Sequence, residues 1–234
     1  ETACLFDASD VPSSEKLGAL RRKLDLENST DKDDDVAKLT QELNQASTSV
    51  RKAYFYRKRA EVYQQRQNHA MAIADFTRAL ELDPTQNWLL CDIAYARYMT
   101  GDYKGTITDC DTIIAKNFDP TYRSGAYMYR GWALERLNRL PSALDSYNSG
   151  LRCNPNDVSV LWARARLLEQ MGKVNEALYD YRQAIEIGQL LPTVNKDYIE
   201  QVQRDLDRAS DSFSIESEDE PFTPDPQYYY TDLD

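Results

Sequence analysis

The chain has 234 residues, of which 41% are hydrophobic, and a formal net charge of −11 at pH 7. This hydrophobic content can support a core, and no apolar run approaches the ~20 residues that span a bilayer. The acidity lies in the flanks, because residues 210–234 hold eight acidic groups and no Lys or Arg. The near-neutral middle of the chain has no basic stripe, which argues against a nucleic-acid partner.

The first 35 residues are predicted to form an N-terminal extension. Ser13 and Ser14 precede leucines at helical spacing, which indicates one capped helix. A charged linker, 27–35, follows it. From Val36 onward apolar residues again recur at helical spacing, so we expect a second helix over 36–50. This helix would cover the apolar face of the first repeat of a solenoid that extends over 36–209.

Small and large residues then recur at fixed intervals. Small residues occupy one position in steps of 34, 37 and 34 residues: Ala60, Ala94, Gly131 and Ala165. A second position follows 16 residues later in each case: Phe76, Cys110, Tyr147 and Tyr181. A period of about 34 residues is typical of stacked helical hairpins. The predicted repeats are approximately 53–86, 87–123, 124–157 and 158–191.

Each repeat is predicted to be a helix, a short turn and a second helix. The turns fall where breakers recur: Gln67-Asn68, Gly101, Asn138 and Gly172. The residue before a proline disfavours the helical region, so we expect prolines to end the second helices of the first three repeats: Pro84, Pro120 and Pro155. Gly188 and Pro192 would end the fourth. The three extra residues of the 37-residue step are placed in the loop between the second and third repeats.

Residues 193–209 place apolar side chains on one helical stripe, which predicts a capping helix. Residues 210–234 are acidic and lack a helical period, so we expect a disordered acidic tail. Two interpretations stay open for its QYYYTDLD segment, 227–234. It is either a solubilising end or a short motif, which would dock on a partner or on the chain's own groove.

These recurring residues resemble the pattern of tetratricopeptide repeat proteins. The first repeat matches nearly in full and the third and fourth match well. The second is weaker, because Thr106, Cys110 and Ile113 replace the usual Ala, aromatic and Ala. The resemblance implies an all-α fold, an α-solenoid of about four helical hairpins with N-terminal flanking helices. We expect the second repeat to be locally the least stable.

The resemblance also implies that the first helix of each hairpin lines a concave groove. The helical period then predicts the groove residues: Tyr54, Arg57, Lys58, Trp88, Asp92, Tyr95, Met128, Tyr129, Trp132, Arg136, Trp162 and Arg166. Aromatic rings interspersed with Arg suit an extended or helical peptide. Alternatively, some of these rings pack between adjacent hairpins. Members that clamp a peptide carboxylate carry Asn where this chain has Glu61 and Asp92, and these two acidic groups would repel a carboxylate, so that function is not expected.

No catalytic, cofactor or metal site is expected. His69 is the single histidine, predicted to be a solvated turn residue. The four cysteines show no CxxC spacing, so free thiols are favoured. A bridge from Cys4 stays open if the protein is exported.

The sequence therefore predicts a non-enzymatic scaffold or adaptor that binds a protein segment, such as an assembly or chaperone-like factor of a multi-protein complex. One alternative is a structural subunit permanently occupied by its partner. Another is a regulatory protein whose Tyr-rich acidic tail gates the groove. The oligomeric state stays open. So does the compartment, which is the cytoplasm, or an exported location if the lack of Met at Glu1 reflects leader removal.

Overall fold

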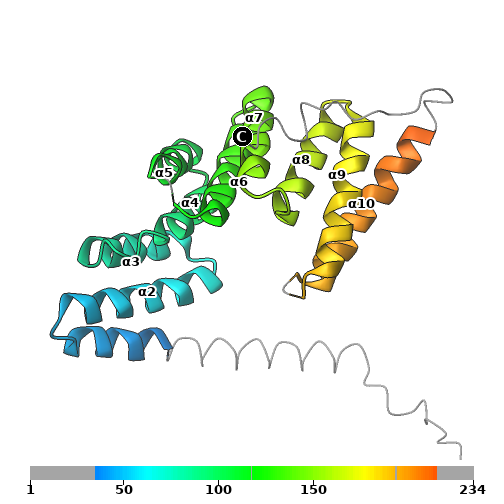
Figure 1. Cartoon of the computed structure of the whole chain (residues 1–234). Helices are drawn as coiled ribbons and strands as arrows, with labels where there is room; N and C mark the ends of the chain where they lie inside the picture. The colour runs from blue at the N-terminus through cyan, green and yellow to red at the C-terminus, as the bar shows by residue number, and fades with distance from the viewer. Residues whose placement is uncertain (1–34, 117, 193, 215–234) are drawn as a thin grey trace, which may run out of the picture. The chain divides into compact units, whose positions relative to one another are not determined.

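The computed structural model describes residues 35–116, 118–192 and 194–214, whose regular structure is helical throughout. The chain divides into two units, residues 1–85 and 86–234, and each is described by itself. The described residues contain four helical hairpins followed by one further helix (Figure 1). The predicted all-α repeat architecture is therefore confirmed. Among the described helices, none combines the length and apolarity that crossing a bilayer requires.

The first unit holds a helix over 35–45 and the hairpin of α2 (Ser49–Gln65) and α3 (His69–Leu82). Thr48 and Asn68 begin these helices, because their side chains accept hydrogen bonds from the backbone N–H groups of Arg51 and Met71. The two helices pack through small residues and one ring that are almost fully buried: Ala53, Ala60, Ala72, Phe76 and Ala79.

The second unit holds three hairpins and a final helix. The first helices of its hairpins are α4 (Leu89–Met99), α6 (Pro120–Arg136) and α8 (Val158–Gln170). The second helices are α5 (Tyr103–Ala115), α7 (Leu140–Cys153) and α9 (Val174–Leu190). The last helix, α10 (Lys196–Ser214), packs along α9. Each first helix also contacts the next one, α4 with α6 and α6 with α8.

All four turns place one residue in the left-handed region. Gln67 has φ 60°, Gly101 83°, Asn138 57° and Gly172 76°. These residues recur at the same steps of 34, 37 and 34 as the core positions. Gly and Asn tolerate this conformation well, whereas Gln67 adopts it at a cost of roughly 1–2 kcal/mol. The turns lie where the sequence predicted them.

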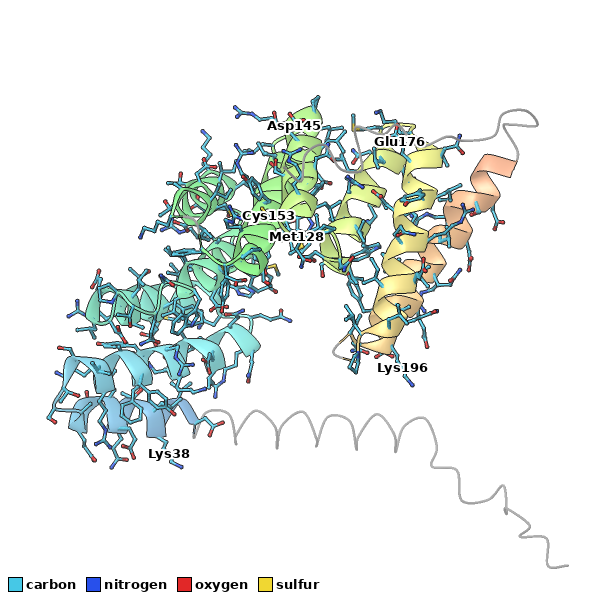
Figure 2. All side chains as sticks on the ribbon, viewed as in Figure 1. Lys38, Met128, Asp145, Cys153, Glu176 and Lys196 are labelled. Atoms are coloured by element: carbon cyan, nitrogen blue, oxygen red, sulfur yellow. The ribbon has the colours of Figure 1, made fainter. Side chains whose placement is uncertain are left out.

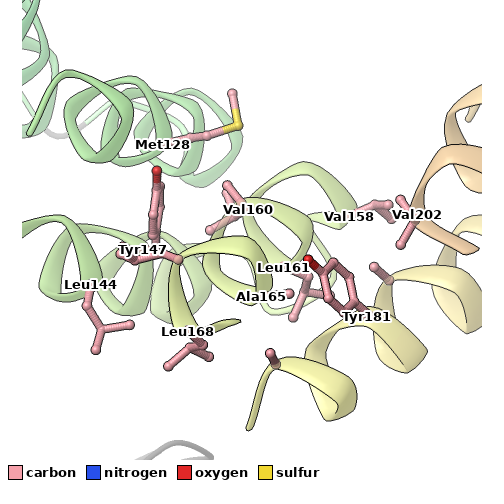
Figure 3. Packing of buried hydrophobic residues seen from close by; sticks show 14 of the residues in the cluster. Met128, Leu144, Tyr147, Val158, Val160, Leu161, Ala165, Leu168, Tyr181 and Val202 are labelled. Atoms are coloured by element: carbon pink, nitrogen blue, oxygen red, sulfur yellow. The ribbon is translucent and has the colours of Figure 1, made fainter. Parts of the chain in front are cut away.

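In each repeat, the large residue packs against the small residue that stands 16 positions earlier in the sequence. Tyr147 and Tyr181 are both 0% exposed, and they lie in one cluster with Val160, Leu161 and Leu168 (Figure 3). A Cβ atom added to Gly131 would lie 2.3 Å from Cε1 of Tyr147. The small residue therefore provides the space that the ring fills, as the recurring pattern predicted.

The placement of the three extra residues in a loop was wrong. The connection between α5 and α6 is 116–119, and the connection between α7 and α8 is the equally short 154–157. Instead, α6 begins 11 residues before Gly131, whereas α4 begins five residues before Ala94. Pro120 begins α6 rather than ending a helix, because a first helical residue needs no N–H partner. Asp119 caps this early start by accepting a hydrogen bond from the N–H of Thr121, at 2.9 Å.

Gly188 was also assigned wrongly, since α9 continues through it to Leu190. A Cβ atom at this position would lie 2.1 Å from Cδ1 of Ile199, so Gly188 serves the close approach of α10. The capping helix extends to Ser214, beyond the predicted end at 209. The predicted N-terminal helix and most of the acidic tail lie outside the described residues.

Candidate protein-binding face

The first helices of the second unit place equivalent residues on one side. Tyr95 of α4, Trp132 of α6 and Arg166 of α8 occupy the same position of successive repeats. Because α4 contacts α6 and α6 contacts α8, these positions follow one another across the unit. We call this side chain set the aromatic face. Its members are Tyr95, Tyr98, Tyr129, Trp132, Arg136, Trp162 and Arg166.

The rings of α4 and α6 contact one another across the two helices. The ring centroids of Tyr95 and Tyr129 are 5.8 Å apart, and those of Tyr98 and Trp132 are 5.6 Å apart. Tyr129 and Trp132 meet edge to face at 5.4 Å. These four rings thus pack between adjacent hairpins, as the alternative interpretation expected. They remain partly exposed, so one surface of the cluster faces solvent.

Trp162 of α8 is covered on one side by α10. Its ring meets that of Tyr198 at 5.1 Å, and its Nε1–H donates a hydrogen bond to Asp205 Oδ2 at 2.9 Å. The guanidinium of Arg166 lies over the same indole, with Cζ 5.2 Å from the ring centroid. Sequence reasoning missed Tyr198 and Asp205 as neighbours of Trp162, because nothing local in the sequence pairs α10 with α8.

Two exposed cations lie beside these rings. The guanidinium of Arg136 stacks on Tyr103, with Cζ 5.1 Å from the ring centroid. Arg136 and Arg166 thereby keep their charge at the surface while the ring limits their motion. Glu135 lies close to Arg166, but its carboxylate accepts a hydrogen bond from Tyr147. Burial raises the pKa of Glu135, and the Tyr147 bond and Arg166 only partly oppose this shift.

The remaining predicted residues of the second unit do not all join this face. Trp88 immediately precedes α4 and is 39% exposed. Asp92 lies half-buried in the first turn of α4. Met128 is only 8% exposed and packs in the core with Tyr147 and Val160 (Figure 3). Because its side chain is buried there, Met128 is left out of the aromatic face.

The three predicted residues of the first unit form a separate surface. Tyr54 is 46% exposed, and the guanidinium of Arg57 lies 5.4 Å from its ring centroid. Arg57 and Lys58 both donate hydrogen bonds to Glu61, the second at 2.8 Å. Residues of α2 and of the helix over 35–45, which carries Lys38 (Figure 2), line a hollow of about 470 Å³. Since Glu61 already engages both cations, this surface is poorly suited to clamping a carboxylate.

Two recurring polar contacts were missed by the sequence analysis. Arg59 bonds Asp75 and Arg164 bonds Asp180, both at 2.7 Å and across one hairpin. Tyr hydroxyls likewise donate to a glutamate 12 residues earlier, in the pairs Tyr147–Glu135 and Tyr181–Glu169. The repeat spacing could have revealed both kinds of contact. The Arg and Asp partners are 16 residues apart, and the Glu and Tyr partners are 12 residues apart, in each repeat that has them.

The second repeat breaks the arginine pattern. Ile93 occupies the position of the arginine, and Asp109 lies at the position of Asp75. Arg97 partly replaces the missing cation, with Nε 3.2 Å from Asp109 Oδ2. Burial nevertheless raises the pKa of Asp109, and Arg97 opposes this shift. Asp109 thus has one ion-pair contact with Arg97, whereas Asp180 of the fourth hairpin accepts two hydrogen bonds from Arg164.

His69 is buried at 9% exposure, as the first residue of α3, so the expectation of a solvated turn residue was wrong. Cys91, Cys110 and Cys153 are free thiols. Burial raises the pKa of Cys91 to about 12, which keeps it protonated near neutral pH. Over the described part of the chain, no group of three or more His, Cys, Asp or Glu is arranged to hold a metal ion.

Comparisons with known proteins bear on the family and the fold. A family model described as tetratricopeptide repeat matches residues 16–187. A curated relative, the TPR repeat-containing protein MJ1428 of Methanocaldococcus jannaschii, is 34% identical over 58 residues. That match spans 25% of this chain and only 10% of the relative's length.

Solved structures resemble the chain at low sequence identity. The crystal structure of MamA has a TM-score of 0.56 and 17% identity, covering 70% of this chain and 92% of MamA. A T3SS complex from Aeromonas hydrophila has a TM-score of 0.51 and 15% identity, covering 58% of this chain and 88% of that one. At such identities these likenesses show the fold alone. Since the family model matches more than half of the residues, the chain belongs to the tetratricopeptide repeat family.

Proposed function

We propose that the chain is a protein-interaction scaffold whose aromatic face binds an extended or helical segment of a partner protein. The family and fold support protein binding in general. One observation carries the finer proposal. Arg136 and Arg166 each stack on a ring and stay exposed, beside half-buried rings on successive first helices. Anchored aromatic residues and Arg are the side chains that contribute most to protein interfaces.

The role that fits such a surface is an assembly or chaperone-like factor, because the face presents charge and rings that an incoming segment can use. A structural subunit permanently occupied by its partner is the second candidate. Large apolar side chains on both units favour it, since Tyr54 is 46% and Leu190 77% exposed. The isolated chain separates the two: a soluble monomer favours the first candidate, and aggregation without a partner favours the second.

A display library of random 12-residue peptides, selected on the full chain, tests the proposed face. The selected peptides are then measured against Arg136→Glu and Arg166→Glu, singly and together. Arg182→Glu is the matched control, because Arg182 is an exposed cation on the second helix α9.

We expect the double variant to weaken peptide binding by about tenfold or more, since two exposed cations that meet an acidic peptide each contribute up to about 1 kcal/mol. The control should bind as the unsubstituted chain does. Peptides that bind the unsubstituted chain and all four variants equally, or a selection that yields no binding peptide, would contradict the proposed face.

A further inference from the structure

We propose that the chain's own acidic segment, residues 215–234, docks on the aromatic face and competes with partner proteins. This inference rests on the proposed binding face. It adds the identity of one ligand, which is a segment rich in carboxylates and tyrosines.

The end of α10 lies beside the cationic end of the aromatic face. Helix α10 starts at Lys196 and runs antiparallel to α9, towards the end of the unit where Glu176 lies (Figure 2). Arg208 donates a hydrogen bond to Glu169 Oε2 at 3.0 Å, which places the last turns of α10 beside the last turn of α8. Arg166 lies one turn before Glu169, on the same helix.

Arg136 lies at the same end of the unit. It is the last residue of α6, and α6 and α8 run in the same direction because α7 reverses the chain between them. Packed helices are about 8–10 Å apart, so the step from α8 to α6 adds only about that distance. A segment that leaves α10 at Ser214 therefore starts near both arginines.

The length of the segment is sufficient. Residues 215–234 comprise 20 residues, which span up to about 70 Å when extended. Crossing from α10 over α8 to α6 requires about 20–30 Å at ordinary helix spacing. Tyr228, Tyr229 and Tyr230 can therefore reach the rings of α4 and α6 without unfolding α10.

The chemistry of the segment complements the face. It holds seven acidic residues and no Lys or Arg, and its three consecutive tyrosines lie between Asp225 and Asp232. Exposed guanidiniums pair with carboxylates, and half-buried rings accept edge-to-face contacts from tyrosine. Glu135, the carboxylate near Arg166, already accepts a hydrogen bond from the Tyr147 hydroxyl. Because the segment belongs to the same chain, its effective concentration at the face is about 1 mM, so even a weak contact would compete with partners.

The experiment measures binding of a fluorescein-labelled synthetic peptide, residues 215–234, to the full-length chain by fluorescence anisotropy. The tail variant of the chain carries Tyr228→Ser, Tyr229→Ser and Tyr230→Ser, which leaves every described residue unchanged. A second protein adds Arg136→Gln and Arg166→Gln to the tail variant. The control adds Arg182→Gln instead. Circular dichroism confirms that all four proteins keep the same helix content.

We expect the peptide to bind the tail variant at least tenfold more tightly than the unsubstituted chain, because the tethered segment no longer competes. Replacing Arg136 and Arg166 should abolish most of this binding, whereas replacing Arg182 should not. Raising the salt concentration should weaken binding, since the contacts are exposed ion pairs.

Equal affinity for the unsubstituted chain and the tail variant would overturn the inference, as would binding that ignores Arg136 and Arg166. Failure of the peptide to bind either protein would also overturn it. In those cases the display-selected peptides still test the proposed function independently of the acidic segment. If they bind through Arg136 and Arg166, the face is a docking site that the acidic segment does not use.

Discussion

The Gly131→Ala substitution tests how the hairpins are packed. Gly131 faces Tyr147, whose ring is 0% exposed and whose hydroxyl donates to Glu135. The added methyl carbon would lie 2.3 Å from Cε1 of Tyr147, and two further ring carbons would lie within 2.8 Å. The ring cannot move aside without losing its hydrogen bond or its packing, so the substitution forces α6 and α7 apart.

Overpacking of this kind costs about 1–3 kcal/mol. The loss is partly offset, because Ala stabilises a helix interior by roughly 0.5–1 kcal/mol relative to Gly. Gly125 of the same helix is the matched control, since nothing lies within 4 Å of a Cβ atom added there. Gly125→Ala should therefore stabilise the protein, and Gly131→Ala should be about 1–3 kcal/mol less stable than this control.

Urea denaturation followed by circular dichroism measures both free energies of unfolding. A third protein combines Gly131→Ala with Tyr147→Leu, which removes the ring that the new methyl group meets. Adding Gly131→Ala in this background should cost less than it does opposite Tyr147. Equal stability of the Gly131→Ala and Gly125→Ala proteins would refute the account of hairpin packing.

Two further predictions concern buried charge. The Arg164→Ala substitution should lower the free energy of unfolding by about 3–5 kcal/mol, because it leaves the Asp180 carboxylate, at 1% exposure, without its ion-pair partner. The control Arg78→Ala removes an ion pair in which both side chains are exposed, so it should lower the melting temperature far less. Similar shifts in melting temperature for the two variants would contradict this. Burial raises the pKa of Asp109 in the folded chain, so its contribution to stability is present at low pH and is lost as pH rises through the folded pKa. As the pH rises from about 4 to 7, the Asp109→Asn variant should therefore become more stable relative to the unsubstituted chain. A difference in melting temperature that stays constant over that range would contradict a raised pKa of Asp109.

Sequence periodicity predicted the architecture because the packing positions recur at a fixed interval. Gly131 and Tyr147 could be paired from spacing alone, since every repeat sets a small residue opposite a larger one. Gly101 and Gly172 mark turns because few other residues adopt positive φ without cost. Local composition gave a wrong helix end at Gly188, because the reason for this glycine is a tertiary contact. Gly188 lies inside α9, where the absence of a side chain lets Ile199 of α10 approach closely.

The candidate site was predicted less completely than the fold. Helical period placed Trp132 and Arg166 on one side of their helices, but it does not distinguish a surface residue from one that the neighbouring helix covers. Met128 stands one residue before Tyr129, and the packing of α7 and α8 puts it in the core. The cover of Trp162 by Asp205 depends on how α10 docks, which no local pattern encodes.

The most direct test of the proposed function follows the indole N–H signals of the ¹⁵N-labelled chain, which has three tryptophans. A display-selected peptide is added stepwise and the signals of Trp88, Trp132 and Trp162 are assigned by substitution. We predict that the Trp132 signal shifts with saturation, and that Arg136→Glu with Arg166→Glu abolishes this shift. A peptide that binds while the Trp132 and Trp162 signals stay unchanged would contradict the aromatic face as the docking site.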